Sequence, residues 1–287
     1  MGYSPMERAE AFLRAGELHD ALDALSEQIA AIPDDQAAYR LRIGILLRLA
    51  HQEPDQHDSH LQAAAADLTH LEPLMVEDLI HQYQVVQRLQ GADAAHQLLI
   101  DRYTGSSPGD PAHDPRWVEL LLESLYQRGD SATAINLLFD LPKTWRWLRW
   151  NGDFHALKGD DRVALDYYCS ALDTLDETAQ DSAPKAAGFI GNLRAQLLIR
   201  RAAMYERLGL YAEAEIDLAE AESLLPADPM IRFRRGLMLF LSGQPDSAFA
   251  LCRAALEDER QPALREAMID LVREEARYAA VRAALGV

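Results

Sequence analysis

Residues 198–229 have the sequence LIRRAAMYERLGLYAEAEIDLAEAESLLPADP. Apolar side chains recur at spacings of three and four on both sides of Gly209, as two amphipathic helices require. The glycine ends the first helix because it enters a left-handed turn without steric cost. Ala214 lets the second helix approach the first closely, and Pro226 stops the second helix. This stretch therefore predicts a helical hairpin.

The hairpin pattern recurs along the chain. Six glycines share the same kind of downstream neighbours: Gly16, Gly91, Gly129, Gly159, Gly209 and Gly243. Five residues after them stand Ala21, His96, Ala134, Ala164, Ala214 and Ala248, and nine residues after them stand Leu25, Ile100, Leu138, Tyr168, Leu218 and Cys252. Hairpins that repeat in a consistent register bury their apolar faces against their neighbours. The sequence therefore predicts an all-α array of stacked hairpins.

These positions resemble the tetratricopeptide-repeat (TPR) family. The match is closest in residues 145–176, 195–228 and 229–260, and weaker in residues 2–35, 36–73, 77–108 and 115–144. The resemblance implies a right-handed α-solenoid (superhelix) of about seven TPR-like helical hairpins with a C-terminal capping helix. We expect N-terminal repeats in residues 1–110, C-terminal repeats continuous with them in residues 111–261, and the capping helix in residues 262–287.

Two stretches depart from the repeat. Residues 105–115 (GSSPGDPAHDP) are rich in turn formers, and we expect them to form a hinge between two halves of the solenoid. Residues 177–192 lengthen one connection, and we expect an added turn of helix or a loop there.

Composition and charge limit the kinds of partner, and the location, that we expect for this protein. The net charge of −18 argues against nucleic acid and anionic membrane surfaces as partners. No apolar run approaches the roughly 20 residues that span a bilayer, and the N-terminus lacks the pattern of a signal peptide. Cys169 and Cys252 are too isolated to indicate a disulfide framework or a metal site. We expect a soluble, cytoplasmic protein.

The TPR resemblance also implies a concave groove lined by the first helix of each hairpin. Its expected lining is Arg40, Arg48, His81, Arg88, Arg116, Tyr126, Arg146, Arg149, Asp153, Arg207, Phe233 and Phe240. Arginine dominates this set, whereas the expected second helices carry most of the acidic residues. We hypothesise that the groove receives an acidic, or mixed acidic and apolar, segment of a partner protein. The alternative is that these arginines only pair with acidic residues of neighbouring repeats.

Residues 143–154 (KTWRWLRWNGDF) hold three of the four tryptophans. Tryptophan and arginine together dominate protein–protein hot spots. Trp150 is the best candidate for contact with a partner, beside Arg146 and Arg149. The alternative is that the tryptophans fill a gap between two imperfect repeats.

The sequence contains no nucleophile motif and no glycine-rich phosphate loop. His51, His57, Asp58 and His60 lie close together in sequence and could ligate a metal, but no helical spacing fixes their geometry. The Lys and Asn positions with which TPR co-chaperones clamp a C-terminal carboxylate read Arg149 and Asp153, Ile199 and Ala203, or Phe233 and Leu237, so this clamp is absent. We expect no catalytic site, no cofactor and no metal.

The favoured function is a non-catalytic protein–protein interaction scaffold or adaptor. A chaperone-like or regulatory TPR protein that binds transient acidic clients is the alternative, and an enzyme is a third possibility. Self-association through an exposed end of the stack also fits a solenoid.

Overall fold

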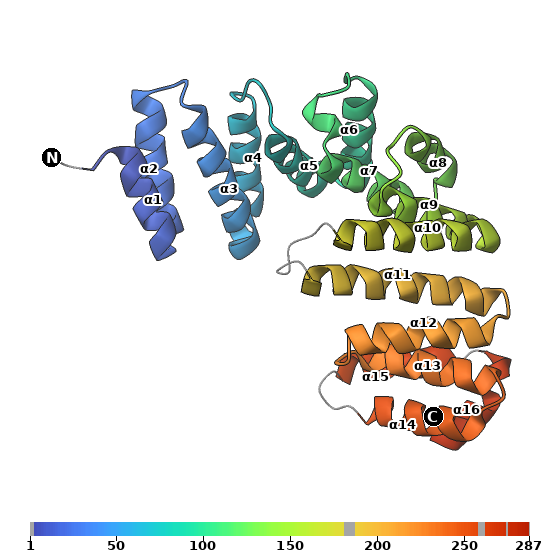
Figure 1. Ribbon diagram of the computed structural model, residues 1–287. Coiled ribbons are helices and arrows are strands. Elements are labelled where there is room, and N and C mark those ends of the chain that lie inside the picture. Colours follow the sequence, from blue (N-terminus) through green and yellow to red (C-terminus); the bar gives the residue numbers. More distant parts are fainter. Residues whose placement is uncertain (1–2, 181–186, 258–261, 274, 287) are drawn as a thin grey trace. The chain divides into compact units, whose positions relative to one another are not determined.

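The computed structural model describes residues 3–180, 187–257, 262–273 and 275–286, and every regular element in these residues is a helix (Figure 1). The all-α hairpin fold is thus confirmed. The chain divides into two compact units, Met1–Gln127 and Arg128–Val287, which are described separately. None of the described helices is both long enough and apolar enough to cross a membrane.

The first unit consists of hairpins stacked in chain order. Its helices are α1 (Pro5–Ala15), α2 (Leu18–Ala31), α3 (Gln36–Gln52), α4 (His57–Leu68), α5 (Val76–Gln90), α6 (Ala92–Thr104) and α7 (Pro115–Gln127). Helix α1 packs on α2, α3 on α4 and α5 on α6, and each hairpin also contacts the next (Figure 1). The first core is formed by Ala9, Leu25, Ile45 and their neighbours, and the second by Ile43, Leu61, Val85 and theirs.

The second unit continues the same construction. Its helices are α8 (Ser131–Phe139), α9 (Trp145–Lys158), α10 (Asp161–Gln180), α11 (Ala187–Arg207), α12 (Tyr211–Leu224), α13 (Pro229–Leu241), α14 (Pro245–Leu256), α15 (Pro262–Arg273) and α16 (Ala279–Leu285). Helices α9 to α14 form three hairpins around one continuous core. Helix α15 packs on α13 and α16 packs on α14, so the C-terminal helices cover the last hairpin as expected.

The glycines found by sequence end or separate helices in the predicted way. All six have a positive φ, between 70° and 90°. Five of the residues that follow them by five positions are alanines with no exposed surface: Ala21, Ala134, Ala164, Ala214 and Ala248. A side chain larger than alanine at these positions would push the two helices of a hairpin apart.

Two other glycines allow an even closer approach of helices. A Cβ atom at Gly152 would lie 2.5 Å from the ring of Tyr168, and one at Gly236 would lie 2.5 Å from Cys252 Sγ. Glycine at these positions therefore permits α9 to pack on α10 and α13 to pack on α14.

The segment at residues 105–115, which interrupts the repeat, is folded. Residues 105–115 include the 3₁₀ turn η2 (Pro111–His113), in which Ala112 is fully buried and His113 packs on Tyr103 with ring centroids 4.8 Å apart. This segment lies inside the first unit, which runs to Gln127. Helix α10 runs to Gln180 and α11 starts at Ala187, so part of the expected lengthening is helix, while residues 181–186 of that stretch lie outside the described residues.

Buried ion pairs also join the helices of two hairpins. Arg42 on α3 binds both carboxylate oxygens of Asp67 on α4, and Arg201 on α11 binds both of Asp217 on α12 at 2.7 and 2.8 Å. Both aspartates are almost fully buried. A buried carboxylate needs such a two-pronged partner because desolvation otherwise disfavours its charge.

Candidate functional site

The arginines expected in the groove fall into two groups, and the larger group is paired with acidic residues. Arg40 binds the buried Asp78 at 3.0 Å, and Arg116 binds Glu77 at 2.7 Å. Arg149 lies 3.7 Å from Asp153, and Arg207 lies 3.1 Å from Asp161. Arg40, Arg116 and Arg207 thus pair with acidic residues of neighbouring hairpins, whereas Arg149 pairs within its own helix.

The aromatic candidates lie mostly inside the second unit. Phe233 has no exposed surface, and Trp147 and Trp150 are each 6% exposed. Phe240 is half-buried and packs on Phe249, with ring centroids 5.9 Å apart. Tyr126 in the first unit is 42% exposed and is the one of these aromatic side chains that offers substantial surface to a partner.

The Trp–Arg segment forms the start of α9. The guanidinium of Arg149 lies over the Trp150 ring at 4.3 Å, and that of Arg146 lies 5.6 Å from Trp145 and 6.0 Å from Trp147. Cation–π contacts of this kind hold the arginine side chains against the rings. The tryptophans thus pack within the repeat array, and the arginines cover them.

Arg48 and Arg88 differ from the four groove arginines that are paired with acidic residues. Both side chains are exposed, and among the described residues neither has a carboxylate within ion-pair distance. Arg88 is held by a hydrogen bond of 3.3 Å from its Nη1 to the backbone oxygen of Leu47, which joins α5 to α3. That bond uses one of the five N–H groups of the guanidinium and leaves the charge without a counter-ion.

The two arginines line one open hollow of about 430 Å³ between α3 and α5. We call it the α3–α5 hollow, and its lining residues are Gly44, Leu47, Arg48, His51, Gln52, His81, Gln84 and Arg88. On α3 the spacing of three and four places the lining residues on one face of the helix, and the same holds for the three residues on α5. None of the eight is acidic, and six have polar side chains that can donate a hydrogen bond.

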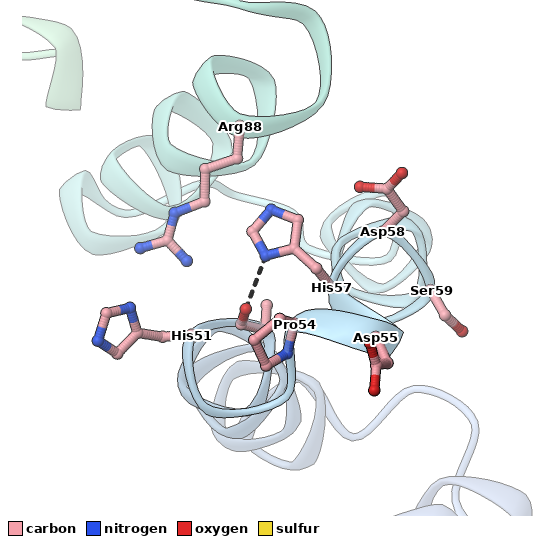
Figure 2. Close-up of a pocket in the computed structure, with 8 residues that line it drawn as sticks. His51, Pro54, Asp55, His57, Asp58, Ser59 and Arg88 are labelled. Atoms are coloured by element: carbon pink, nitrogen blue, oxygen red, sulfur yellow. Dashed lines mark hydrogen bonds between the residues drawn. The ribbon is translucent and has the colours of Figure 1, made fainter.

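A second hollow of about 530 Å³ adjoins the first and shares His51 and Arg88 with it. Figure 2 shows the guanidinium of Arg88 reaching from α5 toward the side where His51 and His57 lie, whereas Asp55 and Asp58 point away from it. His57 Nδ1 lies 2.6 Å from the backbone oxygen of Ala50. Because a carbonyl oxygen only accepts, Nδ1 carries a proton and donates.

His81 is a lining residue of the α3–α5 hollow that has a buried nitrogen atom. Its Nδ1 is buried and has no hydrogen-bond partner among the described residues. Burial lowers the pKa of His81 below its usual value, although the nearby carboxylates of Asp78 and Glu77 oppose the shift. At neutral pH the ring is therefore uncharged and holds one N–H donor, and a buried polar atom of this kind normally has a partner.

The histidines of residues 51–60 that have printed hydrogen bonds contact different groups of the protein. His60 turns inward and binds Glu53 Oε2 at 2.9 Å, while His57 binds Ala50. No group of three potential metal-ligating residues converges in the part of the chain that the structure describes. Cys252 is also unsuited to nucleophilic chemistry, because burial raises the pKa of its thiol to about 12.

The sequence predicted Arg48, His81 and Arg88 as groove residues but did not bring them together. It missed the contributions of Gly44 and Gln84, and it placed His51 only in the metal hypothesis. The spacing of residues 44, 47, 48, 51 and 52 on one helix, and of 81, 84 and 88 on the other, was the signal that could have found the hollow.

The fold is similar to that of solved TPR structures. A tetratricopeptide repeat protein from Parabacteroides merdae ATCC 43184 matches with a TM-score of 0.58 at 13% sequence identity, over 93% of this chain and 96% of that one. The APC/C hetero-tetramer Cut9–Hcn1 matches at 0.44 and 13% identity, over 93% of this chain and 55% of that chain. The TPR domain of P58(IPK) matches at 0.32 and 16% identity, over 98% and 95%.

The first of these matches shows that the chain has a TPR-type fold, and the other two have scores too low to add to it. No family model matches the sequence, and no curated protein does.

Proposed function

We propose that this chain is a non-catalytic scaffold or adaptor. It binds an acidic segment of a partner protein on the surface formed by the first helix of each hairpin. The observation that carries the proposal is the difference between two sets of arginines. Arg40, Arg116, Arg149 and Arg207 have acidic partners within the chain. Arg48 and Arg88 share a hollow and have none among the described residues.

The charge of the whole protein makes this difference informative. The chain carries 46 acidic and 28 basic residues, so a carboxylate is abundant relative to the cations that it could neutralise. Two exposed guanidinium groups border one hollow and offer an anion two positive charges. An acidic segment of a partner would supply that anion and would gain charge-assisted hydrogen bonds.

The remaining groove candidates have different roles in this proposal, according to their exposure and their partners. Tyr126, Arg116 and Arg207 are exposed and can extend the contact surface of their own unit. Arg40, Arg146 and Arg149 are engaged by acidic or aromatic neighbours and serve mainly to hold the helices. Trp150 and Phe233 are buried and Phe240 is half-buried, so we assign them to packing.

A peptide-display selection tests the proposal. A random library is selected on the immobilised full chain and, in parallel, on the double variant Arg48→Glu/Arg88→Glu, after circular dichroism has shown equal helicity. We expect the wild type to enrich segments that contain several Asp or Glu residues and the variant to lose that enrichment. Enrichment without acidic residues, or equal enrichment on both proteins, contradicts the proposal.

A further inference from the structure

The α3–α5 hollow has a feature that protein packing does not explain. Gly44 lies in the middle of α3, where glycine costs about 1 kcal/mol relative to alanine. A Cβ atom at this position would meet nothing within 4 Å, in contrast to Gly152 and Gly236, where it would meet a neighbouring helix. Neither a positive φ nor a close helix contact therefore requires glycine at position 44.

Gly44 instead leaves the floor of the hollow open. It belongs to the same lining as Arg48 and Arg88, and no side chain of its own occupies the space beside them. The missing side chain exposes backbone to whatever enters the hollow, so a ligand could approach α3 closely. The cost of this glycine in helix stability thus coincides with the place where two cations lack a counter-ion.

We propose that the α3–α5 hollow is a binding site for one carboxylate group of a partner peptide, clamped between the guanidinium groups of Arg48 and Arg88. The carboxylate belongs either to an Asp or Glu side chain or to a peptide C-terminus, since both present the same chemistry. This inference rests on the proposed function and names the group that the first unit recognises.

The hollow supplies donors for both carboxylate oxygens. Each guanidinium has a planar fork of N–H groups that matches a carboxylate. Gln84 and Gln52, which also line the hollow, add amide donors. None of the lining residues would repel the ligand, because none is acidic.

The net charge of −18 does not prevent such binding. At physiological ionic strength exposed charges are screened over about 8 Å, so the local arrangement of charge decides the affinity. Asp55 and Asp58, the acidic residues of the adjoining hollow, point away from Arg88 (Figure 2). The overall charge slows the encounter with an acidic peptide, and the two arginines retain it.

The position of Arg88 near a helix end offers a competing explanation for that arginine. Arg88 lies in the last turn of α5, where a positive charge interacts favourably with the helix dipole. That role requires no ligand. It predicts that replacing Arg88 lowers stability and leaves peptide binding unchanged.

Nuclear magnetic resonance of the arginine Nε–H groups in the full chain tests the clamp. The probes are N-acetylated tetraglutamate with a free C-terminus, the same peptide with an amidated C-terminus, and N-acetylated tetraglutamine amide. We expect the signals of Arg48 and Arg88, assigned from Arg48→Gln and Arg88→Gln, to shift with both glutamate peptides and not with the glutamine peptide. A shift with the free C-terminus alone identifies the C-terminal carboxylate as the ligand. No shift with either glutamate peptide at millimolar concentration overturns the inference.

Two variants distinguish a specific carboxylate site from general electrostatic attraction. Gly44→Leu keeps both arginines and fills the hollow with a side chain that favours helix. Arg14→Gln, on the exposed end of α1, removes the same charge as Arg48→Gln but lies outside the hollow. We expect Arg48→Gln, Arg88→Gln and Gly44→Leu each to weaken binding of the glutamate peptide about tenfold or more, and Arg14→Gln to change it less than twofold.

The outcomes also distinguish this inference from the proposed function. If acidic segments from the display selection bind Gly44→Leu, Arg48→Gln and wild type equally well, the scaffold function stands and the clamp is wrong. If the selection yields no acidic segment while tetraglutamate still shifts both arginine signals, the clamp stands and the proposed function fails. Loss of stability in Arg88→Gln with unchanged peptide binding overturns the clamp in favour of the helix-end role.

Discussion

Replacement of Gly236 by alanine should loosen the α13–α14 hairpin. The new Cβ atom would lie 2.5 Å from Cys252 Sγ, 3.1 Å from the backbone oxygen of Ala248 and 3.3 Å from the backbone nitrogen of Cys252. The sulfur can rotate away, but the two backbone atoms can move only if α14 moves. Overpacking of this kind costs about 1–3 kcal/mol, and alanine returns up to about 1 kcal/mol in helix propensity. We therefore expect a net loss of about 0–3 kcal/mol.

Hydrogen exchange measured by mass spectrometry is the suitable assay, because a repeat array does not always unfold in one step. Peptides from α13 and α14 should exchange faster in Gly236→Ala than in the wild type, while peptides from α3 should not change. In a Cys252→Ala background, the further change Gly236→Ala should raise the exchange rate less than it does in the wild type, since the shortest contact is removed. Slower exchange in α13 of Gly236→Ala would refute the close-approach explanation for this glycine.

Four further outcomes follow from the same contacts. Gly44→Ala should stabilise α3 by up to about 1 kcal/mol, because its Cβ meets nothing within 4 Å, and slower exchange of α3 peptides would show it. Arg201→Ala should cost about 3–5 kcal/mol in urea unfolding, because it leaves the buried Asp217 without its partner. Arg116→Ala, which breaks exposed pairs with Glu77 and Asp114, should cost less than about 1 kcal/mol in the same assay. Burial opposes ionisation of Glu222, but hydrogen bonds from Arg232 and Arg235 outweigh burial and hold the pKa of Glu222 below its usual value. The stability that the ionised carboxylate contributes is therefore present at neutral pH and is lost as the pH falls through that lowered pKa. Glu222→Gln should accordingly be less stable than the wild type at neutral pH, and the difference should shrink in acid.

The repeat was predictable from sequence because it depends on local conformation. Gly209, Ala214 and Pro226 each meet a requirement that a single hairpin imposes on its own residues, and the same requirement recurs in every copy. The positive φ of the glycines and the full burial of the alanines bear this out. Local rules of this kind need no knowledge of which hairpin packs on which.

The division of the chain was harder to predict because turn-forming residues also occur inside folded units. Residues 105–115 have the composition of a hinge, yet Ala112 is buried and His113 packs on Tyr103. Ser106 Oγ also lies 3.0 Å from His113 Nε2. Composition indicates where the chain turns, whereas long-range contacts decide whether the turn packs against a core.

The state of each arginine was not predictable because it depends on distances between hairpins. Arg40 and Arg48 stand on the same helix and have the same charge, but Asp78 of the next hairpin reaches only Arg40. The opposite end of α5 brings Arg88, a second cation, to the hollow that Arg48 lines. One neighbouring helix therefore neutralises an arginine at its start and adds an unpaired one at its end. This asymmetry, and not the number of arginines on the face, is the observation on which the proposed carboxylate site rests.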